Sequence, residues 1–433
     1  MKNLGKVALA AALFVAAAAF QHWNSVQAAG GPMPGGAGPY RVLTPIESGN
    51  LLLFPVVRAD GKSIAETPFI TLDEGLKSGE VEVTEAGRAR GLVRQRGEVI
   101  GVPPYSSPNS NTYQPPPDTY RGDEVNTLVL VNHSKRPLLL LAGEIVTGGK
   151  QDRIIAKDRI VPADADPIDL SVFCIEPGRW TGSSSSFGAA GKSAAKSFMV
   201  QPEVRERAMA EQDQQQVWNS VNGAIAQMEA AASAPPAGAG VGSGAGRGAS
   251  AHRQLDTTSY ARAVQDTAVS EKVDEAAASV MNAREQVLAK LRDEHAIGVV
   301  VAVRGEIIWA DLFASTDLLS RYWTKLVRSY AAESLTEGKN HAAPSVADAQ
   351  HFLDAPSGGT ENSEGEVGIY RYSELKGGGA ETFVLESLLP GTGYGVHISK
   401  MKLRSEESQV VEPNPIYEPP TFRPGVFRSE VDR

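Results

Sequence analysis

The sequence predicts an α+β protein, with a β-rich N-terminal half, folded as a sheet or a sandwich, before a C-terminal half of helices and a β-hairpin. Two observations lead to this prediction. Between residues 41 and 180, short apolar or alternating segments are separated by turn-forming residues. After residue 200, long segments rich in helix-forming residues dominate, and residues 297–312 carry a strong hairpin signal.

The strands of the first half can be placed from local patterns. Residues 126–131 and 137–141 flank Asn-His-Ser-Lys-Arg, which predicts a hairpin with a longer loop. Residues 168–175 alternate in polarity, as in a strand with a buried face, and Cys174 lies on the apolar side. We therefore expect a buried core thiol, because a reactive thiolate needs a nearby base and no histidine is close in sequence.

The elements of the second half follow from helical spacing and one short turn. Residues 202–229, 260–293 and 316–333 carry helix formers, and the last segment is amphipathic. Residues 297–303 and 306–312 are apolar and flank Arg-Gly, a pair typical of a two-residue hairpin turn.

Composition divides the chain into a family-sized domain, insertions and tails. Two segments are too rich in Pro, Gly, Ala or Ser to form regular elements, a third is polar, and the C-terminal stretch has the composition of a disordered tail. The expected organisation is a domain at 41–403, with a β-rich part (41–180), a Pro-rich insertion (101–123), a helical part (202–229), a Gly/Ala-rich linker (230–250), an α+β part (255–403) with a polar insertion (335–366), and a tail (405–433).

The N-terminal residues have the pattern of a secretory signal peptide. Lys2 and Lys6 precede an apolar run at residues 7–20, and small residues before a cleavage point after Ala28 follow. The run is shorter than the about 20 residues of a membrane span, so we expect cleavage of residues 1–28 and a periplasmic or secreted protein without a membrane span.

The charge and cysteine content exclude several classes of protein. The net charge of −9 would become −11 when the two lysines of the signal are removed. Nucleic acid is not an expected partner, because its binding normally requires a basic face. The single cysteine rules out an intramolecular disulfide framework.

The first charged motif is LAGEIVTGGKQDR at residues 141–153. It is not a phosphate-binding P-loop, because Glu144 stands where the first glycine belongs and Gln151 replaces the metal-binding hydroxyl. Its glycines allow close backbone approach, so Glu144, Lys150, Gln151 and Arg153 could surround a small polar ligand. The alternative is a solvated turn whose charges pair with one another.

The second charged motif is CIEPGRW at residues 174–180. Glu176 and Arg179 are polar groups at a strand end, where Pro-Gly redirects the chain, and the Arg179 fork suits a carboxylate or phosphate. Trp180 would stack on a ligand or cover the core.

Metal ions and cofactors are not expected. The seven histidines form no HxH or HExxH pair, and the chain contains no EF-hand pattern, nucleophile elbow or nucleotide loop. Asp311, at the end of the second hairpin strand, is expected to cap a turn rather than to serve a site.

Together the two motifs resemble the signature of the ARG and rhodanese-phosphatase-superfamily-associated domain, where ARG stands for ADP-ribosylglycohydrolase. TLDEGLKSGEVEVTE (71–85) and GVVVAVRGEIIWADLF (298–313) extend the similarity over residues 41–403. The family has no established reaction. The resemblance implies one shared site at the charged motif positions Glu144, Lys150, Gln151, Arg153, Glu176 and Arg179.

Two functions remain open from the sequence, so that enzymatic activity is undecided. The first is a non-catalytic binding or accessory module of the cell envelope that holds an anionic small molecule or an envelope protein. The second is a hydrolase for a phosphate- or ribose-containing substrate, with Glu144 or Glu176 as general base and the cations stabilising developing charge. A purely structural charge network is a third reading.

Overall fold

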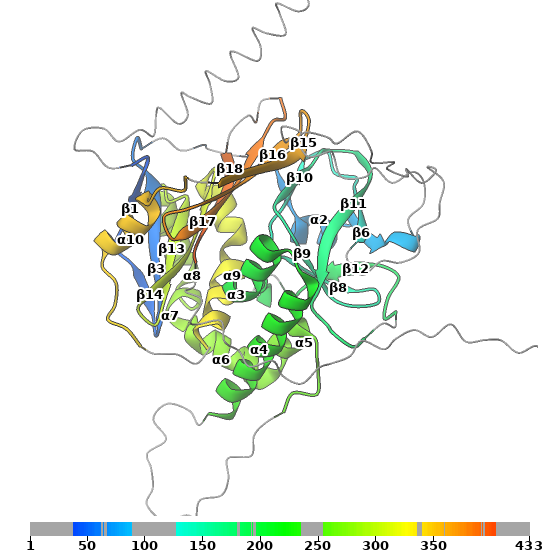
Figure 1. Ribbon diagram of the computed structural model, residues 1–433, viewed down its shortest axis with the longest axis horizontal. Helices are drawn as coiled ribbons and strands as arrows, with labels where there is room; N and C mark the ends of the chain where they lie inside the picture. The colour runs from blue at the N-terminus through cyan, green and yellow to red at the C-terminus, as the bar shows by residue number, and fades with distance from the viewer. Residues whose placement is uncertain are drawn as a thin grey trace, which may run out of the picture. The chain divides into compact units, whose positions relative to one another are not determined.

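The largest sheet joins strands from both ends of the chain (Figure 1). The computed structural model describes residues 38–403 except 62–63, 65–66, 89–126, 180–181, 192, 194–195, 235–253, 336–339, 359, 391 and 393–394. Within this part, a nine-stranded antiparallel sheet has the order β1-β3-β13-β14-β18-β17-β16-β15, and β2 also pairs with β3. Its strands are β1 (Tyr40–Val42), β2 (Ile46–Ser48), β3 (Leu51–Arg58), β13 (Gly298–Val303), β14 (Glu306–Phe313), β15 (Thr360–Glu366), β16 (Tyr370–Gly377), β17 (Ala380–Ser387) and β18 (Gly395–Lys402).

The hairpin predicted at residues 297–312 is confirmed as β13 and β14, in the middle of this sheet. Arg304 has φ 51° and Gly305 has φ 81°. A tight two-residue turn of this kind needs positive φ at both central positions, which Gly adopts without strain. The C-terminal half holds more strands than this hairpin, because β15 to β18 extend the same sheet.

The two faces of the nine-stranded sheet are covered by different helices. On β3, Leu51 and Leu53 join one buried cluster with α9 (Thr316–Ser334), the helix predicted at residues 316–333. Leu52 and Phe54 point to the other face and pack with α10 (Val346–Asp354). This alternation is the period of a strand buried on both sides.

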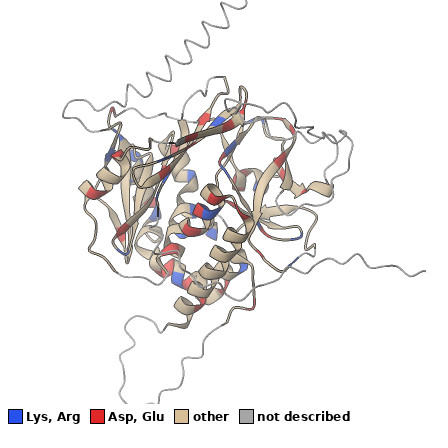
Figure 2. Cartoon of the chain, viewed as in Figure 1, with Lys and Arg blue, Asp and Glu red and all other residues tan. Residues whose placement is uncertain are grey.

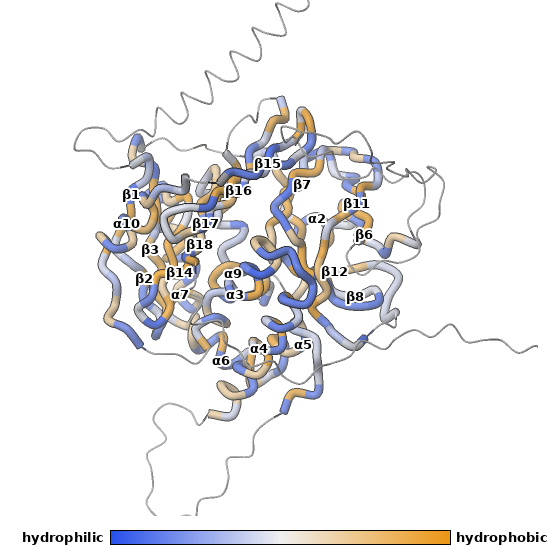
Figure 3. Tube along the Cα trace, in the orientation of Figure 1, coloured by the Kyte–Doolittle hydropathy of each residue, from blue (hydrophilic) through white to orange (hydrophobic). Residues whose placement is uncertain are grey.

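Two smaller sheets enclose a second core. The six-stranded sheet has the order β12-β8-β9-β11-β6-β5, and the three-stranded sheet has the order β10-β7-β4. Figure 3 shows apolar segments along β6 and β11, as along β3 and β14 of the large sheet. The strands are β4 (Ile70–Thr71), β5 (Val81–Glu85), β6 (Thr127–Asn132), β7 (Leu138–Leu140), β8 (Ile145–Gly148), β9 (Arg153–Ile155), β10 (Arg159–Val161), β11 (Ala165–Cys174) and β12 (Phe187–Ala189).

The hairpin predicted from residues 126–131 and 137–141 is wrong, although both strands exist. β6 pairs with β5 and β11, whereas β7 pairs with β4 and β10. The Asn132 amide donates to the carbonyls of Arg136 and Pro162, which holds the turn away from a hairpin path. The four consecutive leucines require β7 to lie between the two cores. Leu138 and Leu140 pack into the core of the smaller sheets, and Leu139 and Leu141 pack into the core beside the large sheet.

The helices predicted at 202–229 and 260–293 are each divided into several shorter helices, whereas the one predicted at 316–333 is continuous as α9. The segment at 202–229 becomes α3, a π-helical turn and α4, interrupted where Gln212 has φ 51° and Asp213 caps α4. Figure 1 shows α9 between the large sheet and the smaller sheets, with α4 to α6 beside it. The remaining helical elements are α2 (Leu72–Ser78), η1 (Ala86–Arg88), α3 (Pro202–Glu206), η3 (Arg207–Glu211), α4 (Gln214–Ser233), α5 (Tyr260–Gln265), α6 (Thr267–Ala276), α7 (Ala278–Met281) and α8 (Arg284–Asp293).

Several predicted segments differ from the structure or lie outside it. The segment at 335–366, expected to be an insertion, contains α10 and β15, and residues 230–233 of the expected linker form the end of α4. The segments predicted as a signal peptide (1–28), a Pro-rich insertion (101–123) and a tail (405–433), and also Trp180, lie outside the described residues. Among the described helices, none has the length and apolar character of a membrane span.

Candidate functional site

The two charged motifs lie next to each other because their strands pair. β9 is antiparallel to β11, and Arg153 lies opposite Cys174. Beyond this pair, the Ile175 N–H donates to the carbonyl of Asp152 at 3.1 Å. The residues just before β9 therefore face those just after β11.

Glu176 is the polar centre of this junction. Its Oε2 accepts from the Asp152 N–H at 3.1 Å and from Arg179 Nη2 at 2.5 Å. The Gln151 amide donates to the Glu176 carbonyl at 3.0 Å, and Arg179 Nη1 donates to the Gly149 carbonyl at 3.2 Å. One arginine thus joins both motifs. We call the set Lys150, Gln151, Asp152, Glu176 and Arg179 the glycine-loop site.

Gly149 lets the loop pass close to its neighbours. Its φ is 51°, and a Cβ at this position would lie 2.2 Å from the Phe187 ring and 2.6 Å from Glu85 Oε1. A side chain here would clash, so the turn requires glycine. The next N–H, that of Lys150, donates to Glu85 Oε1 at 2.7 Å, which fixes the loop to the end of β5.

The acids of the glycine-loop site point inward, and Arg179 of the site and the neighbouring Arg262 of α5 lie outside them. Glu176 and Asp152 are buried, whereas the side chains of Arg179 and Arg262 are 17% and 59% exposed. Burial raises the pKa of Asp152, while the Ser259 hydroxyl, donating at 2.7 Å, opposes the rise. Arg262 Nη2 lies 3.9 Å from Glu176 Oε1. A ligand arriving from solvent would therefore meet positive charge first.

Arg153 and Cys174 belong to the interior behind this site. Arg153 is fully buried, and burial lowers the pKa of its guanidinium, although the neighbouring Cys174, Glu85 and Asp152 oppose this. Burial also raises the pKa of the Cys174 thiol. Both observations support a core role, as predicted for Cys174.

Glu144 lies in a different cluster from the other motif residues. It is fully buried, and Lys325 Nζ of α9 contacts its Oε1 at 2.5 Å and Asp73 Oδ1 at 2.7 Å. Its other oxygen accepts from the Leu141 N–H at 2.8 Å. Burial lowers the pKa of Lys325, but the attraction of Glu144 and Asp73 outweighs it and raises that pKa to about 12. The expected single site is therefore wrong for Glu144, because the chain turns inward directly after the leucines.

A second buried network was not predicted from the sequence. His397 Nδ1 lies 2.6 Å from Asp158 Oδ2, and His397 Nε2 lies 3.1 Å from Asp311 Oδ1. Arg205 of α3 holds Asp311 with two donors, at 2.8 and 3.0 Å, and Ser399 and Tyr330 also donate to this carboxylate. Asp311 is therefore no turn cap. An acid inside an otherwise apolar strand was the available signal.

The charges of this network alternate. Burial lowers the pKa of His397, but Asp158 and Asp311 outweigh it and raise that pKa to about 9. Asp311 is equally buried, and Arg205 with His397 holds the pKa of its carboxyl well below its usual range. Two acids and two cations thus balance without solvent. Figure 2 shows acidic and basic positions close together on the helices between the sheets. In the described part of the chain, no group of three or more His, Cys, Asp or Glu side chains could hold a metal ion.

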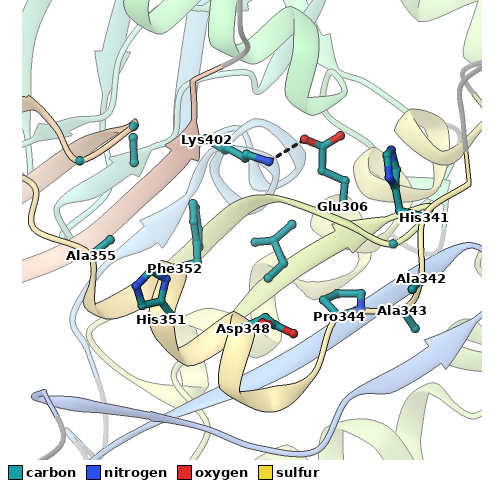
Figure 4. Close-up of a pocket in the computed structure, with 15 residues that line it drawn as sticks. Glu306, His341, Ala342, Ala343, Pro344, Asp348, His351, Phe352, Ala355 and Lys402 are labelled. Carbon is teal, nitrogen blue, oxygen red and sulfur yellow. Dashed lines mark hydrogen bonds and ion pairs between the residues drawn. The ribbon is translucent and has the colours of Figure 1, made fainter.

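The cavities formed by the described residues include two that lie away from the glycine-loop site. One, of about 680 Å³, opens between α10 and the turns of the large sheet, and Phe352, His351 and the Glu306–Lys402 ion pair lie around it (Figure 4). The polar side chains that line it are exposed to solvent and do not converge on one point. The second, of about 340 Å³, lies where β15 and β16 approach β11, and Asp158 forms part of its wall.

Comparison with known proteins identifies the family of the chain. No curated protein and no solved structure matches it significantly. One family model matches residues 39–401, and its description is ARG and Rhodanese-Phosphatase-superfamily-associated Protein domain. Because the match spans nearly all described residues, the chain belongs to this family.

Proposed function

We propose that this protein is an exported, non-catalytic binding or accessory module, and that its glycine-loop site holds an anionic group of a small molecule or of an envelope protein. Export rests on the signal pattern at residues 1–28. The site has a net positive outer layer in a chain of net charge −9, which favours an anion at this place over the rest of the surface.

The observation that carries the proposal is the orientation of charge at the motif junction. The Glu176 carboxylate accepts from Asp152 N–H and Arg179, and Asp152 accepts from Ser259 and the Gly148 N–H. These hydrogen bonds already satisfy the acids inside the protein. Arg262 and Arg179 lie on the solvent side, where a planar guanidinium suits a carboxylate or phosphate.

The same contacts count against the hydrolase alternative. A general base must reach a substrate proton at hydrogen-bond distance. Glu176 is buried behind Arg179, and Glu144 is buried against Lys325. Burial also raises the pKa of the Cys174 thiol, which disfavours a nucleophilic thiolate.

A binding screen tests the proposal directly. The mature protein is titrated by thermal shift with nucleotides, sugar phosphates, inorganic phosphate and carboxylates, and each hit is measured by calorimetry. Arg262→Ala should weaken binding of the hits about two- to fivefold, as for an exposed charge pair. Arg179→Lys should weaken it about tenfold, because one ammonium cannot keep the contacts with Gly149 and Glu176 and also face the ligand as the planar guanidinium does.

Arg292→Ala is the matched control, because Arg292 is exposed on α8, far from both motifs in sequence. Equal affinities in all three variants would place the ligand elsewhere and refute the site. A screen without any stabilising anion would refute the proposed function.

A further inference from the structure

The cavity of about 340 Å³ has walls from all three sheets. β6 and β11 belong to the six-stranded sheet, β10 to the three-stranded sheet, and β15 with β16 to the edge of the large sheet. Ligand sites are often found where separate structural units meet. The polar side chains that line it include Thr127, Lys157, Asp158, Arg159, Gln212 and Glu364.

Arg159 presents an incompletely bonded guanidinium to this cavity. Its side chain is only 6% exposed. Nη1 donates to the Asp169 carbonyl at 2.7 Å, and Nη2 lies 3.6 Å from Glu366 Oε2, beyond a good hydrogen bond. In the described part of the chain, the buried Nε has no hydrogen-bond partner. Leaving a buried donor unpaired is costly, so an oxyanion that reached Nε and Nη2 of this guanidinium would gain a hydrogen bond that the protein does not supply.

Lys157 supplies a second cation, and the Glu364 carboxylate that pairs with it can be displaced into solvent. Its Nζ lies 2.7 Å from Glu364 Oε1 on β15, with side-chain exposures of 22% and 37%. Such partly exposed pairs contribute little to stability, so Glu364 can move into solvent at small cost. An incoming anion would take its place opposite Lys157.

The acid between these cations is already neutralised from behind. Asp158 accepts from the Ala142 N–H at 2.7 Å, and its other oxygen lies 2.6 Å from His397 Nδ1. Its charge is therefore engaged by the buried network and does not cancel Lys157 and Arg159. Of the charged side chains that line the cavity, Lys157 and Arg159 are cationic, and Asp158 and Glu364 are acidic.

We propose that this cavity is a second ligand site, separate from the glycine-loop site, and that it binds a small oxyanion, a carboxylate or phosphate group, between Lys157 and Arg159 by displacing Glu364.

Neutralising each member of the Lys157–Glu364 ion pair separately tests this proposal, because the two changes should alter the affinity in opposite directions. Calorimetric titration with inorganic phosphate and with citrate, at low ionic strength, is done on the full mature chain. Lys157→Gln should weaken binding about tenfold, because it removes a charge-assisted contact. Glu364→Gln should strengthen binding about two- to fivefold, because the competing carboxylate is gone. If the Lys157–Glu364 pair served only the fold, Glu364→Gln would not bind the anion more tightly than the unmodified protein.

Glu306→Gln is the matched control. Glu306 pairs with Lys402 at 2.8 Å beside the other cavity (Figure 4), so its neutralisation should leave the affinity unchanged. Tighter binding by Glu364→Gln alone supports the site. Equal affinities of Glu364→Gln and Glu306→Gln, or no binding by the unmodified protein, would overturn it. If Arg262→Ala lost binding while Lys157→Gln bound as tightly as the unmodified protein, the anion would lie at the glycine-loop site. This result would also overturn the proposal.

Discussion

Replacing His397 by glutamine should make the stability of this protein less dependent on pH above neutrality. The ordinary pKa of histidine is 6.5, and Asp158 and Asp311 raise that of His397 to about 9 against the effect of burial. A group with a raised folded-state pKa stabilises the protein fully below its unfolded pKa. That stabilisation is lost as pH rises from about 6.5 through about 9.

The size of the effect follows from the difference between the two pKa values. Each unit corresponds to about 1.4 kcal/mol, so the protonated imidazole contributes about 3 kcal/mol to the free energy of unfolding at pH 6. His397 is 1% exposed, so solvent screening reduces this little. Above about pH 10 only its packing against Phe313 and its neutral hydrogen bonds remain.

The assay is urea unfolding followed by tryptophan fluorescence at pH 6, 7, 8, 9 and 10. The difference in unfolding free energy between the unmodified chain and His397→Gln should shrink by about 3 kcal/mol from pH 6 to pH 10. His351→Gln is the control, because His351 is exposed and outside the network. A difference that stays constant with pH would refute the assignment of a protonated His397 between two acids.

Three further predictions concern other parts of the chain. Cys174 is buried, so it should resist alkylation in the native protein, and Cys174→Ser should cost about 1–3 kcal/mol of stability; rapid native alkylation would contradict this. Gly149→Ala should destabilise by more than about 1 kcal/mol in thermal unfolding, because of its positive φ and its contacts, whereas Gly188→Ala, with open space, should not. Mass spectrometry of the envelope fraction should find a mature chain that begins at Ala29, and retention of residues 1–28 would contradict export.

The sequence predicts those elements whose signal is local. The turn at Arg304 and Gly305, the amphipathic pattern of α9 and the alternation of β11 are each decided within a few residues. β15 could not be placed, because its sequence TENSEGE is polar and it forms the edge of the sheet. The pairing partners of the strands could not be predicted either, because no local pattern shows that β6 pairs with β5 and β11 and not with β7.

The site was predictable in part for the same reason. Asp152, Glu176 and Arg179 meet because adjacent strands carry two recognisable motifs. His397 and Asp158 are 239 positions apart, so only the three-dimensional fold brings them together. Asp311 gave a readable clue, because a charge inside an apolar strand needs a buried partner.

The division of the first motif between two clusters follows from α9. Along this helix, the Tyr322 hydroxyl donates to the Leu139 carbonyl, Lys325 contacts Glu144, and the Ser329 hydroxyl donates to the Val200 carbonyl. These residues are three and four positions apart, so they lie on one face of the helix. That face binds the leucine strand and the segment before α3 to the helix that covers the large sheet. Removing Lys325 would leave Glu144 as an unpaired buried charge, a loss typically of about 3–5 kcal/mol. Glu144 is thus explained by its contact with Lys325 of α9, which joins the sheets, whereas Arg179 and Arg262 lie beside Glu176 in the other cluster.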